Sequence, residues 1–209
     1  MMNNTTQITR TNGRIYTIRN NRDRFFYPGE WLKFKEQLKD FQIITFDCLI
    51  STGARINELR NLQKQDIDFE NKRLTLRVTK VKAARKETHP RPRIIPFSTQ
   101  FGRRLKGYFN DKVSEDYLGI LSTPGANISM KKALQRAGIT DWQMFSIHNI
   151  RKTFEIWLMA IGIDGLKLTA HLGHSLNVAA SSYISADVFS SEEKMQIRDI
   201  LGDLYQIRY

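Results

Sequence analysis

The 209-residue sequence has little cysteine and no long apolar run. Its single cysteine, Cys48, lies in the apolar stretch FQIITFDCLI, so disulfide bonds cannot organise the fold and no cysteine cluster offers a zinc site. We expect Cys48 to fill the core. No run of about eighteen apolar residues is present, and the polar N-terminus lacks the apolar segment of a signal peptide. These absences predict a soluble, cytoplasmic protein, and the length predicts one domain.

Negative charge is also scarce, because 21 Asp and Glu residues oppose 33 Lys and Arg residues and leave a formal net charge of +12. A basic surface attracts polyanions and releases their condensed counterions on binding, so nucleic acid is the leading candidate partner. The positive charge gathers in the head of the chain and between residues 72 and 93, which favours a binding face. A solvated surface on a basic protein is the alternative. A membrane surface is less favoured, because neither segment has an amphipathic helical pattern.

Hydrophobic periodicity predicts an α+β domain that is mainly α-helical and has a small antiparallel sheet. Residues 1–24 are polar and basic, and we expect a flexible arm or a single loose strand there. The stretch FQIITFDCLI is nearly all apolar and predicts a helix surrounded by other helices. A preceding helix, which begins at Pro28, is expected to bury four apolar side chains, Trp31, Leu32, Phe34 and Leu38.

A basic β-hairpin is predicted in the middle of the chain. Alternating Leu74, Leu76 and Val78 predict one strand, and RPRIIPFS predicts its returning partner. The connection KVKAARKETHP is long and charged, so we expect an exposed tip. Further helices are predicted near TQFGRRLKGYF, ISMKKALQRAG, NIRKTFEIWLMAIG, DGLKLTAHLG, LNVAASSYI and SSEEKMQIRDILGDLY.

The motif STGARINEL places Arg55 at the start of a helix. A cation there opposes the helix macrodipole, so local stability does not explain the arginine. Either Arg55 pairs with an acid, Glu58 or Asp66, or it faces an anion.

Two later motifs add histidines, an arginine and a tyrosine. His148 and Arg151 are three residues apart, which places them on one helical face, where they could grip one phosphate together. LGHS, at residues 172–175, is followed by Tyr183. A capped helix end with a partly buried tyrosine is the structural alternative for this stretch.

Taken in order, the motifs TGARINEL, RIIPFS, HNIRKTFEI, LGHS and SSYI resemble those of the tyrosine recombinases, also called the phage integrase family. The resemblance runs from about Phe25 to Asp187 and implies the catalytic-domain fold of that family. It implies six catalytic residues: Arg55, His148, Arg151, His174, the nucleophile Tyr183, and a hairpin lysine that is Lys80 or Lys82, with Lys80 slightly favoured.

Other positions depart from the family's pattern or lie outside it. Lys152 stands where the family often has histidine, but this position is outside the catalytic set. His89 and His171 have no counterpart role in the family. We expect His89 to lie at the hairpin tip and His171 to be an ordinary helix residue. DNA contacts are expected from six basic side chains of the arm and hairpin: Arg14, Arg19, Arg22, Lys82, Arg85 and Lys86.

The resemblance implies a chemistry that suits these residue types. A phenol has a pKa near 10, so Tyr183 needs a base, for which His148 is suited, and a positive field. Guanidinium donors from Arg55 and Arg151 hold the five-coordinate phosphorane, His174 donates a hydrogen bond, and the hairpin lysine protonates the leaving 5′-oxygen. The intermediate is a 3′-phosphotyrosine. No metal or other cofactor is expected, and no Asp/Glu cluster suited to two magnesium ions is obvious.

The domain organisation follows from the same resemblance. We expect a basic arm at 1–24, a catalytic domain at 25–187 and a C-terminal helix at 188–209, without the family's N-terminal core-binding domain. The chain is then either a short single-domain recombinase or a catalytic fragment. The C-terminal helix either docks on a neighbouring protomer or folds back on its own domain.

The expected partner is double-stranded DNA, bound by a protein that is monomeric when free and tetrameric on synapsed sites, with accessory proteins in some reactions. A prokaryotic or mobile-element origin and a nucleoid-associated location fit this family. Two other functions stay open: DNA relaxation like that of type IB topoisomerases, and a DNA-binding accessory or regulatory protein that does not cut.

Overall fold

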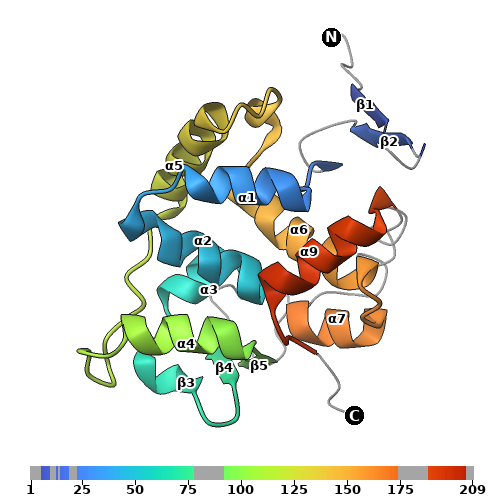
Figure 1. Cartoon of the computed structure of the whole chain (residues 1–209). Coiled ribbons are helices and arrows are strands. Elements are labelled where there is room, and N and C mark those ends of the chain that lie inside the picture. The colour runs from blue at the N-terminus through green and yellow to red at the C-terminus, as the bar shows by residue number, and fades with distance from the viewer. Residues whose placement is uncertain are drawn as a thin grey trace, which may run out of the picture.

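The computed structural model describes residues 6–9, 13, 15–18, 23–77, 92–173 and 188–205. Its helices are α1 (Pro28–Glu36), α2 (Asp40–Thr52), α3 (Ile56–Arg60), α4 (Thr99–Tyr108), α5 (Thr123–Arg136), α6 (Ile147–Ala160), α7 (Gly165–Leu172) and α9 (Ser191–Leu201), with the 3-10 turns η2 (Lys64–Asp66) and η3 (Trp142–Met144). Its strands are β1 (Thr6–Thr9), β2 (Ile15–Ile18), β3 (Ile67–Asp68), β4 (Arg73–Leu76) and β5 (Arg93–Pro96). The predicted class, mainly α-helical with a small antiparallel sheet, is confirmed (Figure 1).

Helix α2 lies at the centre of the domain, where it packs against α3, α4, α5 and α6. Its apolar sequence explains this position, because a helix that is hydrophobic on all sides must be covered on all sides. Cys48 is fully buried, which confirms that it fills the core. Gly53 ends the helix in a left-handed conformation (φ 58°), and a Cβ atom there would lie 2.3 Å from Cδ1 of Phe154. Glycine is therefore required where the end of α2 meets α6.

Helix α1 covers the aromatic part of the core. Trp31 and Phe34 are buried, and both rings pack against the ring of Phe26. The prediction that Leu32 is buried is wrong, because this residue is 41% exposed. Each residue turns a helix by about 100°, so Leu32 points away from the face that Trp31 and Phe34 share.

Strands β3, β4 and β5 form one antiparallel sheet in that order. The predicted hairpin is confirmed, with Leu76 opposite Arg93 in the register of β4 and β5. Leu74 and Leu76 are buried, as their alternation predicted. Strand β3 was not predicted, because its two residues are too few to show an alternating pattern. The connection between β4 and β5, at residues 78–91, lies outside the described residues.

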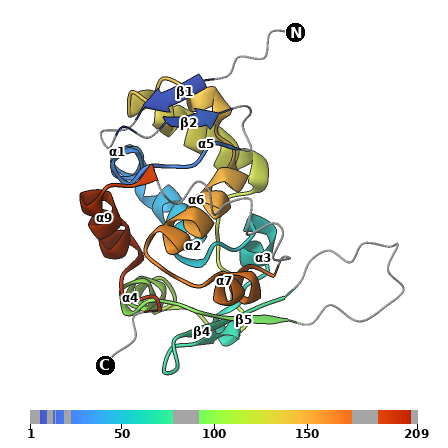
Figure 2. The same ribbon diagram turned by 90° about the vertical axis from the view of Figure 1, so that its right-hand side faces the viewer.

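The N-terminal segment forms a second, two-stranded sheet of β1 and β2, with Thr6 opposite Ile18. The prediction of a single loose strand is wrong, because two strands pair, whereas the alternative of a flexible arm stays a prediction. The ring of Tyr16 packs against Phe25 with 5.0 Å between centroids, and its hydroxyl donates to the carbonyl of Asp23. The two sheets lie at opposite ends of the molecule (Figures 1 and 2).

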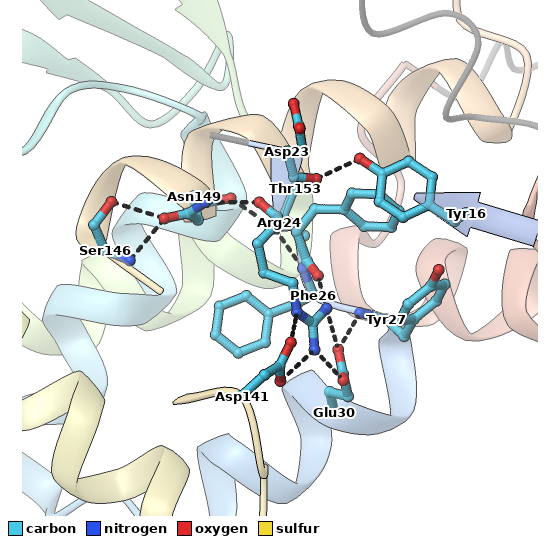
Figure 3. Close-up of polar contacts among 11 residues, drawn as sticks. Tyr16, Asp23, Arg24, Phe26, Tyr27, Glu30, Asp141, Ser146, Asn149 and Thr153 are labelled. Carbon is cyan, nitrogen blue, oxygen red and sulfur yellow. Dashed lines mark hydrogen bonds and ion pairs between the residues drawn. The ribbon is translucent and has the colours of Figure 1, made fainter. Parts of the chain in front are cut away.

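Arg24 anchors the segment after this hairpin in the core (Figure 3). Its side chain is 2% exposed, with Nε 2.7 Å from Oδ2 of Asp141 and Nη2 2.5 Å from Oε1 of Glu30. The guanidinium lies 4.4 Å from the ring centroid of Phe145. Its backbone carbonyl accepts a hydrogen bond from Nδ2 of Asn149 at 2.7 Å. The last residue of the predicted basic arm is therefore a buried tie between α1, η3 and α6.

We expect Arg24→Met to lower the free energy of unfolding by about 2 kcal/mol, because both carboxylates lose their cation. Glu30 and Asp141 keep side-chain exposures of 23% and 26%, so water replaces part of the lost interaction. Urea denaturation followed by tryptophan fluorescence measures the change. Arg104→Met is the matched control, because Arg104 is 31% exposed and Asp47 keeps a second cation, Lys35. A loss no larger than that of the control would contradict the anchoring role.

Helix α9 packs against α1 and α6 of its own chain (Figure 1). Ser190 caps its start by accepting from the backbone N of Glu193 at 3.2 Å. Ile197 and Leu201 are buried, whereas Met195 is 64% exposed. After the helix, Asp203 accepts hydrogen bonds from Thr99 and Lys72, which tie the C-terminal turn to α4 and the sheet. Docking of this helix on a second protomer stays a prediction.

Candidate active site

Arg55 and Arg93 bind one buried carboxylate, that of Glu58 in the first turn of α3. Oε1 of Glu58 is 3.1 Å from Nη1 of Arg55. Oε2 is 2.8 Å from the backbone N of Arg55 and 2.7 Å from Nη2 of Arg93. Asp66, the other acid that the sequence offered to Arg55, pairs with Arg77. Because the Arg55 side chain is still 51% exposed, its guanidinium can bind Glu58 and also face an anion.

The charge of this cluster is positive. Burial raises the pKa of Glu58, but the backbone N–H of Arg55 and the charges of three arginines outweigh burial, so the pKa lies below its ordinary value. Arg151 is the third of these arginines. Glu58 is therefore ionised at neutral pH. The charge of a second buried carboxylate, Glu155, also acts on Arg151. Two carboxylates do not neutralise three guanidinium groups, so the cluster keeps an excess positive charge that favours a further anion.

Arg151 is the most buried of the three arginines, at 6% exposure. Its Nη1 donates to the carbonyl of Gly53 at 2.8 Å, and its Nη2 donates to the carbonyl of Leu172 at 2.6 Å. These carbonyls stand at the C-terminal ends of α2 and α7, where helix dipoles favour a cation. Burial, with the charges of Arg55 and Arg93, lowers the pKa of Arg151 to about 10. The side chain still carries its charge at pH 7, in a fixed orientation.

His148 is exposed in the first turn of α6, three residues before Arg151. The neighbouring Asn149 fixes this turn: its Oδ1 accepts from the backbone N of Ser146 at 2.7 Å, and its Nδ2 donates to the carbonyl of Arg24 (Figure 3). Helix starts leave backbone N–H groups without helical partners, so such a cap prevents fraying. The turn that bears His148 is thus tied to the segment that enters the core.

The prediction that His171 is an ordinary helix residue is wrong. His171 is 3% exposed, with Nε2 2.8 Å from the carbonyl of Thr52 and Nδ1 2.5 Å from the hydroxyl of Tyr205. A carbonyl can only accept, so Nε2 carries the proton and Nδ1 accepts from Tyr205. Burial chiefly, aided by nearby arginine charges, lowers the pKa of His171 to about 4, against the opposing hydrogen bond to Thr52. The neutral ring links the ends of α2, α7 and the C-terminal turn.

Because the pKa of His171 is depressed in the folded protein, protonation favours the unfolded chain. Its contribution to stability is fully present above pH 6.5 and is lost as pH falls toward 4. We expect about 2 kcal/mol of this loss by pH 5. His171→Gln, which can still donate to Thr52 but does not titrate, should lose correspondingly less between pH 7 and pH 5 in urea denaturation. Parallel pH profiles of the two proteins would contradict this assignment.

The structure brings together two of the predicted catalytic residues, Arg55 and Arg151, and places His148 on the same helix as Arg151. The other predicted catalytic residues lie outside the described residues, namely Lys80, Lys82, His174 and Tyr183. The same is true of the predicted DNA contacts Arg14, Arg19, Arg22, Arg85 and Lys86. These assignments stay predictions.

Sequence reasoning missed Arg93 as part of the site. Arg93 and Ile95 alternate on β5, and Ile95 is fully buried, so the period of two places Arg93 on the same face. That signal was available in RIIPFS. It could not indicate that the side chain meets Glu58, which is far away in the sequence.

Two features are missing from the described ranges. No helix there is long and apolar enough to cross a membrane. Within the same ranges, no three His, Cys, Asp or Glu side chains gather into a group that could hold a metal ion.

An arginine cluster with excess positive charge, held by buried contacts in a mainly helical domain, has the chemistry to bind a phosphate or another oxyanion. The chain belongs to the phage integrase family, whose model matches residues 35–188. It is 30% identical over 139 residues to the tyrosine recombinase XerA of Saccharolobus solfataricus, covering 66% of this chain and 43% of that protein. It is 26% identical over 137 residues to XerA of Thermococcus kodakarensis, covering 61% and 44%. The chain thus spans less than half the length of these curated relatives.

Solved structures have the same fold. A crystal structure of XerA recombinase matches with a TM-score of 0.62 and 19% identity, covering 89% of this chain and 65% of that one. The catalytic domain of bacteriophage HP1 integrase matches with a TM-score of 0.57 and 18% identity, covering 88% and 98%. XerH bound to its difH substrate, in a pre-cleavage complex, matches with a TM-score of 0.56 and 18% identity, covering 79% and 49%.

Proposed function

We propose that this chain carries the catalytic domain of a site-specific DNA recombinase, which breaks and rejoins DNA strands through a 3′-phosphotyrosyl intermediate. The observation that carries the proposal is the pair of Arg55 and Arg151, held by Glu58 and by helix-end carbonyls in a chain of the phage integrase family. The proposed substrate is double-stranded DNA. Support comes from the structures of XerH bound to a difH substrate and of the Tn1549 integrase in complex with transposon right end DNA.

The proposed chemistry gives each residue a role in nucleophilic attack, proton transfer or charge stabilisation. Tyr183 attacks the phosphorus and gives its proton to His148, while the exposed guanidinium of Arg55 and the free N–H groups of Arg151 bind the non-bridging oxygens. His174 donates a third hydrogen bond. A hairpin lysine, Lys80 before Lys82, protonates the 5′-oxygen as the P–O bond to it breaks. Rejoining is the reverse attack by a 5′-hydroxyl, so bond energy is kept and no cofactor is consumed.

The proposed DNA contacts follow the charge of the chain. The basic side chains of the arm and the hairpin bind phosphates, so affinity falls steeply with salt. The protein is a monomer in free solution and a tetramer on synapsed sites, with residues 25–187 as catalytic domain and residues 188–209 as a helix able to dock in trans. A prokaryotic cytoplasm and a mobile element suit such an enzyme.

A capture experiment tests the proposal without a known target. The protein is mixed with a random duplex library in EDTA and stopped with detergent, and the DNA that stays attached to protein is sequenced. Peptide mass spectrometry identifies the attached residue. The expected result is DNA joined through its 3′-phosphate to Tyr183. Duplex binding without any adduct would favour an accessory DNA-binding protein instead. Adducts spread over unrelated sequences, with relaxation of supercoiled plasmid, would favour a topoisomerase-like activity.

A further inference from the structure

Arg93 is a buried arginine that the proposed chemistry leaves without a role. Its side chain is 14% exposed and extends from β5 toward α3 and α7. Nη2 donates to Oε2 of Glu58 at 2.7 Å, and Nη1 donates to the carbonyl of His171. Both terminal nitrogens of Arg93 therefore bind protein groups, and one of these groups is the carboxylate that also binds Arg55.

The contacts of Arg93 tie three parts of the candidate active site together. Glu58 also binds Arg55: the guanidinium of Arg93 holds Oε2 of the carboxylate, and the guanidinium of Arg55 binds Oε1. His171 lies near the end of α7, two residues before Gly173. Strand β5 returns from the hairpin connection that carries the candidate lysines. Figure 2 shows α7 beside β5 and α3 on the same side of the domain.

The side chain of Arg93 also restricts which residue can stand at position 173. Gly173 has a left-handed conformation (φ 66°), and a Cβ atom there would lie 2.6 Å from Cδ of Arg93. Any other residue would push Arg93 away or move the chain just before His174. The glycine of LGHS therefore makes room for Arg93, in addition to ending the helix.

We propose that Arg93 is a positioning residue, which orients Arg55 through Glu58 and holds the end of α7 next to the arginine pair. The effect of Arg93 on strand cleavage rests on the proposed function, whereas its effect on the Arg55 side chain does not. A lysine in its place has one ammonium group and cannot reach both Glu58 and the His171 carbonyl with the geometry of a guanidinium.

The test uses Arg93→Lys in the full chain, with Arg104→Lys as the matched control. Arg104 also binds a buried carboxylate, that of Asp47 at 2.8 Å, but this pair joins α4 to α2 and involves neither Glu58 nor His171. The first readout is the NMR signal of the Arg55 guanidinium, assigned by its loss in Arg55→Lys. We expect a distinct, ordered signal in the wild type and in Arg104→Lys, and an averaged, mobile one in Arg93→Lys.

The second readout is single-turnover cleavage of a captured DNA site at saturating DNA. Arg93→Lys should cleave about 10- to 100-fold more slowly, as expected when a supporting contact is lost, with DNA affinity within about twofold. In an Arg55→Lys background, the Arg93→Lys change should cost at least about threefold less, because Arg93 acts partly through Arg55. A residue that only stabilised the fold would lower the melting temperature without this coupling.

The outcomes separate the two proposals. An Arg55 signal that is unchanged in Arg93→Lys overturns the positioning role, whether or not the protein cleaves DNA. Equal losses in affinity and cleavage also overturn it, because they indicate direct contact of Arg93 with DNA. If the wild type forms no adduct while Arg55 becomes mobile in Arg93→Lys, the recombinase function fails and the link from Arg93 to Arg55 stands.

Discussion

Replacing Tyr183 with phenylalanine is expected to abolish covalent capture of DNA and to leave DNA affinity within about twofold. The change removes the one oxygen proposed to attack phosphorus, and no neighbouring base or arginine can substitute for a missing nucleophile. The aromatic ring is kept. Gel separation of protein–DNA adducts in detergent measures capture, and fluorescence anisotropy measures affinity for the same duplex.

Other tyrosines of the chain serve as controls for this result. Tyr117 is 56% exposed in the segment before α5, and Tyr117→Phe should capture DNA like the wild type. Tyr205 is a poor nucleophile, because burial raises its pKa to about 12 and its hydroxyl donates to His171. Adducts that persist in Tyr183→Phe would contradict the proposed nucleophile, and peptide mapping would then identify the true one.

Arg151→Lys is expected to slow strand cleavage by about 10² to 10³, the usual effect of removing one donor to transition-state charge. The guanidinium holds the carbonyls of Gly53 and Leu172 and still has N–H groups for a phosphate oxygen. An ammonium group has three protons and no planar fork, so it cannot satisfy both carbonyls and bind the phosphate in line. Single-turnover cleavage of the captured site measures the loss.

The same variant should also acquire a new pH dependence. The surroundings lower the pKa of Arg151 to about 10 and should act in the same direction on a lysine. The ordinary pKa of lysine, about 10.4, is already about two units or more below that of arginine. The lysine of the variant should therefore lose its charge as pH rises above about 8, and the cleavage rate of the variant should fall further there. The wild-type arginine should keep its charge over the same pH range. Arg77→Lys is the control, because Arg77 is 54% exposed and pairs with Asp66 away from the cluster. Equal profiles in both variants would contradict a charge role for Arg151.

The sequence predicted the helical class, the β4–β5 hairpin and the residues of the arginine pair, because these depend on local patterns. Alternation along a strand and apolar spacing along a helix follow from backbone geometry within a few residues. Arg55 and Arg151 were found because their neighbours form short motifs in a fixed order. The same reasoning wrongly predicted that Leu32 is buried, because a run of apolar residues does not show which side of a helix packs against the core.

Only the tertiary structure decided what the arginines meet. Arg93 binds Glu58 and His171, and Arg24 binds Asp141, across separations of 35, 78 and 117 residues in the sequence. No local pattern reports such pairs, because a buried charge is stable only where folding brings opposite charges and carbonyls around it. Sequence by itself thus determined which side chains could do the chemistry. Packing decided which of these side chains have a fixed orientation. Burial makes an unpaired charge costly, so a buried charged group must stay in the orientation that keeps its partners.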